Sequence, residues 1–533
     1  MAFTERQKRK VERTLLNKRS YKAIIYGRFF TCLISAMLQF AFYVVLLIWF
    51  AYGSPVATIV QLFTSLISFL FILRLIARNE KPSSKLSWIL LICIFPIFGC
   101  LTYLVNGDGR LTRKMQKKVQ KAKEENVAAL KEFYGEKALP DAVSRADGAS
   151  LYLQKQCNCP VFYDGEVEYF KSGEEMFPAM KETLRAAKQF ILLDYFIIAP
   201  GKMWGEILEI LLEKAKQGVQ IRILYDDFGC MMHLPPKYEL YLESLHENIR
   251  CMTFNNVVPF FDVRMNNREH RKIMVIDGKT AFTGGINLAD EYIGEKRRFG
   301  YWKDTGVKIC GDAVNSFTVM FFDLWNAIRK EKESLKNYLQ PRTDKNLTGE
   351  NTPVRLQPYD DSPLDNVNAG ETMYVDIINR AEKYVYIFTP YLILDDFLRM
   401  ALCQAALRGV DVRIVTPGIP DKKTVFRLTR ANYTVLMNAG VKIYEYSPGF
   451  LHAKSILCDD KYAVVGTINF DYRSLYIHFE NAVYFSGVDA VNSLKEDCEE
   501  TFAVSKLCTK ENTKRSILGR LFDAILRVFE TLL

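Results

Sequence analysis

Long apolar runs separated by short basic connections make up the N-terminal part of the chain. The run Thr31–Tyr52 carries no charge and has about the length that a helix needs to cross a bilayer. Two further apolar runs follow, Val56–Leu73 and Leu86–Val105, and Pro96 interrupts the second of these. Their length, lack of charge and basic flanks favour membrane helices over buried core helices. The pattern therefore predicts a membrane region over residues 29–106.

After this region the pattern changes to short β-branched runs separated by amphipathic stretches. The first such unit predicts a strand at Phe190–Phe196, a helix at Trp204–Lys216 and a strand at Val219–Asp227. The second half of the chain repeats this order at Val385–Pro390, Phe397–Arg408 and Val410–Val415. A strand, a crossover helix and a second strand form a βαβ unit. The chain is therefore expected to be an α/β protein with two similar halves.

One polar stretch occurs twice, and it carries chemically active side chains. It begins at His270 and again at His452, and from each His the chain has Lys at +2, Asp at +7, Gly at +14 and Asn at +17. The matched residues are Lys272, Asp277, Gly284 and Asn287 in the first copy and Lys454, Asp459, Gly466 and Asn469 in the second. Five matched positions are hard to produce by chance in a chain with only five histidines, so they mark an internal repeat.

Each copy has the pattern of a β-hairpin. In the first copy, Ile273–Ile276 is an apolar run, and Asp277-Gly278 is a strong turn signal. Side chains alternate along a strand, so the His and the Lys share one face. This pair suits a phosphoryl group, because the Lys neutralises oxygen charge and the His attacks phosphorus or transfers a proton. The Asp at +7 has the opposite parity, so the strand period alone does not place it beside the His.

The pattern H-x-K-x4-D, present twice, resembles the phospholipase D superfamily. Other segments are similar to bacterial cardiolipin synthases, and residues 86–106, LSWILLICIFPIFGCLTYLVN, look like the membrane-proximal segment of that family. The remaining similar segments are Thr389-Pro390-Tyr391, Arg408–Val412, Arg473-Ser474 and the Leu-Leu terminus. The resemblance implies two pseudo-symmetric phospholipase D-type domains, each a mixed sheet flanked by helices, behind an N-terminal α-helical membrane region.

The expected organisation has seven parts. They are a basic tail (1–28), the membrane region of two to three helices (29–106), a basic helical connector (107–148), the first phospholipase D-type domain (149–339), a linker (340–353), the second such domain (354–512) and an amphipathic C-terminal helix (513–533). The last helix either docks on the core or lies on a membrane surface.

Two halves with one His-Lys pair each favour a single shared site that needs both histidines. One neutral His attacks phosphorus and forms a phosphohistidine, while the other gives a proton to the leaving alcohol and then acts as a base. By family analogy His270 is the nucleophile and His452 the acid and base, and the symmetry of the halves permits the reverse. The catalytic candidates are His270, Lys272, Asp277, His452, Lys454 and Asp459.

Four further residues are expected to support this site. Asn287 and Asn469 supply hydrogen-bond donors, and each His needs an acceptor on its other ring nitrogen. In the superfamily this acceptor is a carboxylate downstream of each motif, which here points to Asp304 and Glu480. Neither a metal nor another cofactor is expected, since the cysteine pair within 157–159 has no second pair with ligand spacing.

The activity that the resemblance implies is transfer of a phosphatidyl group between two phosphatidylglycerol molecules, giving cardiolipin and glycerol. The net charge of +10, concentrated near the N-terminus, suits an anionic surface. The expected partners are phosphatidylglycerol and anionic membrane lipids rather than nucleic acid, and the oligomeric state is left open. A phospholipase D hydrolase, a nucleic-acid phosphodiesterase and a membrane-anchored lipid-binding scaffold remain alternatives.

The distribution of basic residues bears on the side of the membrane. The basic tail and the connection 74–85 both favour the inside, and another basic run follows the third apolar segment at once. A re-entrant or interfacial third segment, broken by Pro96 and Gly99, reconciles these signals. Twelve cysteines without disulfide-scaffold spacing indicate free thiols in a reducing compartment. The chain is therefore expected to be a multi-pass protein of the cell membrane with cytoplasmic catalytic domains.

Overall fold

The computed structural model describes two compact units, each of which is considered by itself. The described residues are 37, 39–53, 55–78, 81–106, 113–134, 148–256, 267–341, 354–365, 367–513, 516–528 and 530. The larger unit, called the α/β unit here, holds the described residues of Met115–Asn256 and Asn267–Ser516. The smaller one, called the helical unit, holds those of Arg19–Lys114 and Ile517–Leu533.

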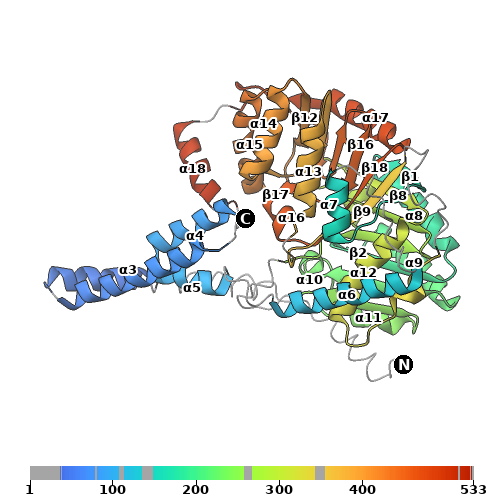
Figure 1. The fold of residues 1–533 in the computed structure, drawn as a ribbon, viewed down its shortest axis with the longest axis horizontal. Coiled ribbons are helices and arrows are strands. Elements are labelled where there is room, and N and C mark those ends of the chain that lie inside the picture. Colours follow the sequence, from blue (N-terminus) through green and yellow to red (C-terminus); the bar gives the residue numbers. More distant parts are fainter. Residues whose placement is uncertain are drawn as a thin grey trace. The chain divides into compact units, whose positions relative to one another are not determined.

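Two mixed β-sheets form the framework of the α/β unit (Figure 1). The first has the order β1-β8-β6-β5-β2-β3-β4, and the second has the order β19-β13-β12-β10-β15-β16-β18-β9. The strands of the first sheet are β1 (Glu166–Phe170), β2 (Phe190–Tyr195), β3 (Gln220–Asp226), β4 (Ile249–Phe254), β5 (Lys272–Ile276), β6 (Thr280–Gly284) and β8 (Gly306–Cys310). Those of the second are β9 (Arg355–Asp361), β10 (Tyr384–Phe388), β12 (Asp411–Pro417), β13 (Lys442–Tyr446), β15 (Ser455–Cys458), β16 (Tyr462–Gly466), β18 (Glu480–Ser486) and β19 (Ser505–Leu507).

The central strands of both sheets follow one plan. Strands β2, β3 and β4 are parallel neighbours, and β5, β6 and β8 continue the sheet with antiparallel pairing. In the second sheet β10, β12 and β13 are parallel, and β15, β16 and β18 continue it in the same antiparallel way. The α/β class and the repeat of whole halves, both predicted from the sequence, are thus confirmed.

Two further pairs of short strands and a set of helices complete the α/β unit. The short parallel pairs are β7 (Tyr301–Lys303) with β14 (Gly449–Leu451), and β11 (Leu392–Ile393) with β17 (Phe470–Asp471). The helices of the first half are α6 (Arg113–Tyr134), α7 (Gly148–Cys157), α8 (Gly173–Ala186), α9 (Lys202–Lys216), α10 (Asp227–Cys230), α11 (Tyr238–Leu245), η5 (Asp290–Ile293), α12 (Val314–Ile328) and η6 (Leu335–Tyr338). Those of the second half are α13 (Ala369–Arg380), α14 (Asp396–Leu407), α15 (Lys423–Asn438), α16 (Tyr472–Tyr476) and α17 (Ala490–Ala503).

Every side chain of strand β5 is buried, because the strand has a hydrophobic core on each face. Met274 and Ile276 join the cluster that helices α8 and α9 build on the outer face of the first sheet. Ile273 and Val275 alternate with them and join a second cluster on the inner face. A strand that is buried on both faces reads as a continuous apolar run, which is the pattern that predicted it.

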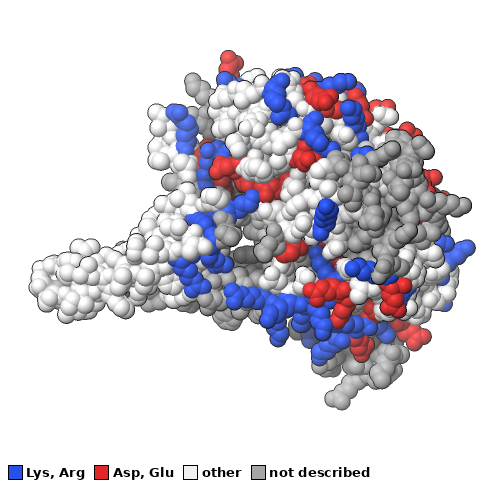
Figure 2. Space-filling view, in the orientation of Figure 1, with Lys and Arg blue, Asp and Glu red and all other residues white. Residues whose placement is uncertain are grey.

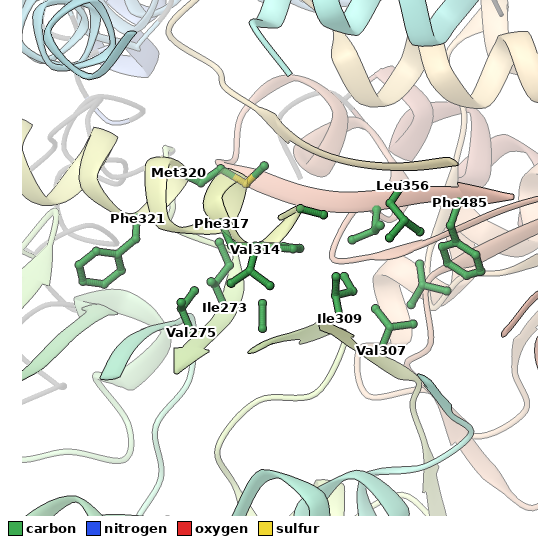
Figure 3. Packing of buried hydrophobic residues seen from close by; sticks show 14 of the residues in the cluster. Ile273, Val275, Val307, Ile309, Val314, Phe317, Met320, Phe321, Leu356 and Phe485 are labelled. Carbon is green, nitrogen blue, oxygen red and sulfur yellow. The ribbon is translucent and has the colours of Figure 1, made fainter. Parts of the chain in front are cut away.

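The inner cluster is shared by the two halves of the α/β unit (Figure 3). Its members come from β5 and β8 of the first sheet, from β9 and β18 of the second sheet, and from helices α12 and α17. They include Ile273, Ile309, Phe317, Leu356 and Phe485, which lie close together in Figure 3. Burial of each such side chain stabilises the fold by roughly 1.5–3 kcal/mol. The two sheets are therefore held in one body by a common apolar core.

Helix α3 (Pro55–Ile76) is the longest apolar element of the helical unit. Its 22 residues rise about 33 Å, close to the thickness of a bilayer's hydrocarbon core. Figure 2 shows α3 as an uncharged surface along most of its length. Within the described residues it is the single helix that is long and apolar enough to cross a membrane. Its helical structure agrees with the apolar run predicted at Val56–Leu73.

The third predicted apolar run is two helices rather than one. Helix α4 (Pro82–Ile94) ends before Phe95, whose φ of −129° and ψ of 78° lie outside the α region that is disfavoured before a proline, and α5 (Pro96–Asn106) begins at Pro96. A side chain at Gly99 would lie 2.6 Å from the Cα of Ile92, so α5 packs back closely against α4. The third run is therefore a closely packed pair of helices, and its re-entrant placement in a membrane stays a prediction.

The first apolar run is helical over Gln39–Ala51 in the described part, which is too short to span a bilayer. With α4 and α5 also short, the described helices do not support a multi-pass arrangement, which corrects that expectation. They do support membrane association through α3.

The remaining predicted segments are described only in part. The connector contains α6, whose exposed Lys and Arg side chains form the row of blue along this helix in Figure 2. The C-terminal helix α18 (Ile517–Val528) belongs to the helical unit, and it exposes Ile517, Leu518 and Leu521. The basic tail 1–28 and all of the linker except residues 340–341 lie outside the described residues.

Candidate active site

The two His-Lys pairs lie at the ends of parallel strands, where loops of both halves gather. In the first sheet Lys272 pairs with Tyr195, the last residue of β2, so His270 lies at the carboxyl end of that strand. In the second sheet Ser455 pairs with Phe388, the last residue of β10, which gives His452 the equivalent place. Ligand sites of α/β proteins form at this edge of a sheet.

All four side chains of the pairs are buried. The exposed fraction is 7% for His270, 8% for His452 and 1% for each of Lys272 and Lys454. Each ammonium folds back onto its own motif: Lys272 Nζ donates to the His270 carbonyl at 2.5 Å, and Lys454 Nζ donates to the His452 carbonyl. The lysines are thereby fixed beside the histidines, as the +2 spacing on one strand face predicts.

Each histidine is bound by a carboxylate from the other half of the chain. Glu480, at the start of β18, lies with its oxygens 2.8 and 2.9 Å from His270 Nδ1. Asp304, directly after β7, lies 2.6 Å from His452 Nδ1. The carboxylate that follows each motif therefore serves the histidine of the opposite motif, which the order along the chain does not reveal.

Backbone pairing between the halves explains this crosswise arrangement. The N–H of His270 donates to the carbonyl of Phe479 at 2.9 Å, and the N–H of His452 donates to the carbonyl of Lys303 at 2.7 Å. Phe479 and Lys303 are the residues just before the two carboxylates, and the second contact continues the β7–β14 pair. The site is therefore complete only when the two halves are joined.

The surroundings of the two carboxylates differ at matched positions of the repeat. Thr467, at +15 from His452, donates its hydroxyl to Glu480 at 2.5 Å. At the same offset from His270 stands Gly285, where an added Cβ would lie 2.0 Å from Asp304 Oδ1. Glycine is thus required there to leave room for the carboxylate. Thr467 and Gly285 could have been found by comparing the two copies of the motif at positions where they differ.

Burial lowers the pKa of both histidines and both lysines in this site. Burial, together with Lys272 and the other nearby cations, lowers the pKa of His270 well below its usual value. Burial and Lys454 lower the pKa of His452 to about 4, although Asp304 opposes the shift. Burial lowers the pKa of Lys272 to about 8 and that of Lys454 to about 7. An anion that enters the site offsets these effects and favours the protonated groups.

The two expected asparagines are engaged with protein groups. Asn287 accepts from the Ile197 N–H at 3.0 Å and donates to the Tyr292 hydroxyl at 2.7 Å. Asn469 donates to the Ser474 hydroxyl at 3.0 Å. In this geometry the amides hold neighbouring side chains in place.

The aspartates at +7 lie at the far ends of their strands. The Asp277 carboxylate accepts the backbone N–H groups of Lys188, Gln189 and Phe190 at 2.7–2.9 Å. Asp459 does the same for residues 382–384 at 2.7–2.8 Å. Asp277 is five positions along the chain from Lys272, a span of about 16 Å in a strand. This geometry gives both aspartates a structural role and does not support their inclusion among the catalytic candidates.

His478 is a residue of the site that the repeat did not reveal. Its ring lies 5.5 Å from that of His270, and its Nε2 accepts from Arg473 Nε at 3.3 Å. The copy of this position in the first half is Trp302, also two residues before the carboxylate, so the repeat carries no matching histidine. Its place beside Glu480, in a chain with five histidines, was the available signal.

Among the described residues, one group has atoms close enough to hold a metal ion. His270, His478 and Glu480 have ligand atoms within 4.8 Å of one another. The His270–Glu480 hydrogen bond already accounts for this closeness. The positive charges of Lys272 and Arg473, which act on His478, disfavour a cation there.

Known proteins resemble this chain over most of its length. Residues 180–298 and 374–502 match the family described as "Cardiolipin synthase, PLD-like domain", and residues 65–107 match "Phospholipase_D-nuclease N-terminal". The cardiolipin synthase 2 of Bacillus anthracis is 33% identical over 471 residues, which cover 86% of this chain and 88% of that protein. The cardiolipin synthase of Alkalihalophilus pseudofirmus is 32% identical over 449 residues, covering 83% and 87%.

Two further similarities concern an uncharacterized protein and the fold. An uncharacterized protein of Streptococcus mutans is 42% identical over 468 residues, covering 87% of this chain and 99% of that one. The phosphatidylserine synthase of Haemophilus influenzae has a TM-score of 0.55 and 16% identity, covering 73% of this chain and 100% of that chain. At that identity the likeness concerns the fold alone.

Two α/β halves of one plan, joined around a shared site, define a protein of the phospholipase D superfamily. Such proteins act on different phosphodiesters, so the fold alone does not give the activity. The matched families and relatives narrow the class: the chain belongs to the bacterial cardiolipin synthases and is a phosphatidyltransferase.

Proposed function

We propose that this protein makes cardiolipin by moving the phosphatidyl group of one phosphatidylglycerol to a second, through a phosphohistidine, with release of glycerol. The observation that carries this proposal is the crosswise pair of histidines, each bound at Nδ1 by a carboxylate. That bond fixes the ring and leaves Nε2 for the reaction, as in catalytic triads. Two lysines in the same buried site suit the oxygens of a phosphodiester.

The first step forms the covalent intermediate. Nε2 of His270 attacks phosphorus, and the bond from phosphorus to the glycerol oxygen breaks. His452 must be protonated at this moment, because the leaving oxygen takes its proton. The pKa of His452 is lowered to about 4 by burial and by Lys454, so the bound phosphodiester anion has to offset those charges before the proton is held.

The second step reverses the roles. His452, now neutral, takes the proton of the primary hydroxyl of a second phosphatidylglycerol, and that oxygen attacks phosphorus. The bond to His270 breaks, the histidine becomes free and cardiolipin leaves. The lysines remain charged throughout and balance the phosphoryl oxygens.

The assignment of His270 as the nucleophile rests on resemblance to the superfamily. The near-symmetry of the two pairings makes the exchanged assignment the alternative. A single turnover quenched in cold denaturant at mildly alkaline pH, where the phosphorus–nitrogen bond survives, followed by mass spectrometry of the phosphohistidine peptide, decides between them. A phosphatidyl group on the peptide that contains His452 would overturn the assignment.

We also propose that the α/β unit faces the cytoplasm. Basic residues lie in the last turn of α3 and in the segment after it, and such residues favour the inner side of a membrane. They are Arg74, Arg78, Lys81 and Lys85. The return of α5 onto α4 supports a hairpin that enters and leaves on one side. Trypsin should therefore cut the α/β unit in inverted membrane vesicles and not in intact spheroplasts; cutting in spheroplasts would contradict this side.

Product analysis tests the proposed reaction directly. The purified protein in detergent receives phosphatidylglycerol alone, beside a double variant His270→Ala, His452→Ala. We expect cardiolipin and glycerol in equal amounts from the unchanged chain and neither from the variant. Phosphatidic acid without cardiolipin would make the protein a hydrolase, and no turnover to either product would also overturn the proposal.

A further inference from the structure

Loops of both halves that lead to the site expose apolar side chains. The chain leaves β3 through residues 227–237, where Phe228 is 41% exposed and Met232 is 63% exposed. It leaves β12 through residues 418–422, where Ile419 is 41% exposed. Strands β3 and β12 hold equivalent places in the two sheets, so these loops belong to the edge at which His270 and His452 lie.

Direct contacts connect these exposed residues to the site. The Arg268 guanidinium lies 5.1 Å from the centre of the Phe228 ring, and Arg268 is two residues before His270. The N–H of Ile419 donates to the carbonyl of Gly449 at 3.2 Å, and β14 runs from Gly449 toward His452. Phe228 and Ile419 are therefore exposed residues that contact the segments leading directly to His270 and His452.

Exposed cations stand beside these apolar side chains. Burial lowers the pKa of His233, on which the charges of Glu291, Lys296 and Arg298 also act, so the Met232 loop lies beside the loop 291–298. We call the exposed surface formed by residues 227–237, 291–298 and 418–423 the rim, and its cations are exposed in both halves. They are Lys296, Arg297, Arg298, Lys422 and Lys423. The carboxylates among them are Glu291, bound to Lys296 at 2.9 Å, Glu295, bound to Lys202, and Asp421, bound to the Tyr391 hydroxyl at 2.7 Å.

We propose that this rim is a second membrane contact, in which Phe228, Met232 and Ile419 enter an anionic phospholipid surface around the mouth of the active site. Apolar side chains flanked by lysine and arginine match the acyl region and the phosphates of such a surface. The reacting phosphorus is joined to two acyl chains that stay in the bilayer. A rim seated on the lipid lets the headgroup reach the buried histidines without leaving the membrane.

This contact differs from anchoring by α3, and it goes beyond the proposed reaction. An anchor keeps the chain at the membrane but does not orient the α/β unit. The rim fixes the orientation, with the mouth of the site against the lipid. It also accounts for apolar exposure at functional loops, which is otherwise unfavourable for the folded chain in water.

Photo-cross-linking of the full-length protein in phosphatidylglycerol vesicles tests the contact without requiring turnover. The variants Met232→p-benzoylphenylalanine and Ile419→p-benzoylphenylalanine should give phospholipid adducts by mass spectrometry. The matched control is Leu407→p-benzoylphenylalanine, since Leu407 is 73% exposed but lies at the opposite end of β12. Adducts at least tenfold more abundant at the two rim positions support the proposal; equal adducts at all three positions, or none at the rim, overturn it.

A second experiment compares activity on phosphatidylglycerol in vesicles with activity on a monomeric form. A triple variant, Phe228→Ser, Met232→Ser and Ile419→Ser, should lose at least fivefold more activity with long-chain phosphatidylglycerol in vesicles than with a monomeric short-chain form. Equal loss with both substrates would mean that the rim acts on folding or on the chemistry, and would overturn the proposal. A chain that cross-links at the rim but makes no cardiolipin would contradict the proposed reaction and leave the contact supported.

Discussion

The crosswise carboxylates are the most informative feature at the scale of single residues. Glu480 binds the Nδ1 of His270, and Asp304 binds that of His452. Both carboxylates are fully buried, so a neutral amide in either place leaves an imidazole with the wrong tautomer or orientation. Each carboxylate should therefore share the kinetic role of the histidine that it holds, and not that of the motif which it follows.

Leaving-group dependence distinguishes these roles. Phosphatidylglycerol needs a proton on its leaving oxygen, whereas a p-nitrophenyl phosphatidyl ester does not. In single turnovers, Asp304→Asn should slow release of glycerol by roughly 100-fold or more, the usual worth of a general acid. With the nitrophenyl ester its loss should be less than about tenfold. Glu480→Gln should slow both substrates alike, because it disturbs His270, the proposed nucleophile.

The matched control for these variants is Glu168→Gln, since Glu168 is paired with Lys308 at the exposed edge of the first sheet. It should leave both rates unchanged. The opposite result would be a rate that the nitrophenyl ester restores in Glu480→Gln and not in Asp304→Asn. It would contradict the proposed roles of the two histidines, given the carboxylate that each one binds.

The two lysines predict how the reaction depends on pH. Burial lowers the pKa of Lys272 to about 8 and that of Lys454 to about 7 in the empty site. In the proposed reaction the protonated lysines bind the phosphodiester anion, and they are protonated below these values. Hence kcat/KM should be highest below about pH 7 and should fall as the pH rises through 7 to 8.

Initial rates of cardiolipin formation at low substrate, from pH 5 to about 9.5, check this dependence. The two titration steps in this profile belong to the interacting pair Lys272 and Lys454 rather than to either lysine alone. The variant Lys454→Arg keeps its charge over this range and should move the fall to higher pH. A profile of the unchanged chain that stays flat to pH 9 would contradict the prediction.

At the scale of elements, the repeated hairpins separate structural from chemical residues. Asp277 and Gly278 both have positive φ, 53° and 64°, as a type I′ turn requires. The Asp277 carboxylate then holds the N–H groups of the chain that enters β2. Asp459 has a φ of 55° and makes the equivalent bonds to the chain that enters β10. The aspartates thus fasten each hairpin to its neighbouring strand.

Asp277→Asn should weaken the fold while leaving the chemistry intact. An amide has one acceptor oxygen, so part of the set of three bonds is lost, at a cost of about 1–3 kcal/mol. The thermal unfolding midpoint should fall by several degrees. Turnover per folded molecule should stay within about twofold, because Asp277 lies about 16 Å along the strand from Lys272. Asp459→Asn should behave alike. Loss of turnover with an unchanged midpoint would make the aspartate catalytic.

The elements that the sequence predicted correctly were predictable for one physical reason. Strand β5 and helix α9 bury continuous or periodic apolar faces, and such faces are visible along the chain. The strands β7 and β14 have three residues each, too few to show a period. Yet this pair carries Asp304 to His452. The two His-Lys pairs were predictable from the repeat, and the two carboxylates from the resemblance to the superfamily. Which carboxylate meets which histidine depends on contacts between the halves that no local pattern contains.

At the scale of the whole molecule, the two halves form one body in the α/β unit. The shared core joins Ile273 of the first sheet to Leu356 and Phe485 of the second. Strands β7 and β14 pair across the halves, and each half supplies a carboxylate to the other. His478 could not be predicted by symmetry, because Trp302 holds its place in the first half. The site is consequently a property of the joined halves rather than of either motif.

A cut between the halves tests this view of the molecule. A specific protease site introduced between Pro341 and Val354 should be cleaved without separating the halves, because the buried apolar core and the backbone pairs persist. The two fragments should elute together in detergent and keep at least about half of the activity, since the cost of losing the connection is mainly entropic and modest. The same cut made in the variant Leu356→Ala, Phe485→Ala should release the fragments, because each truncation removes about 2–5 kcal/mol of core stability. Separation of the fragments in the otherwise unchanged chain would mean that covalent linkage, and not the shared core, holds the two histidines together.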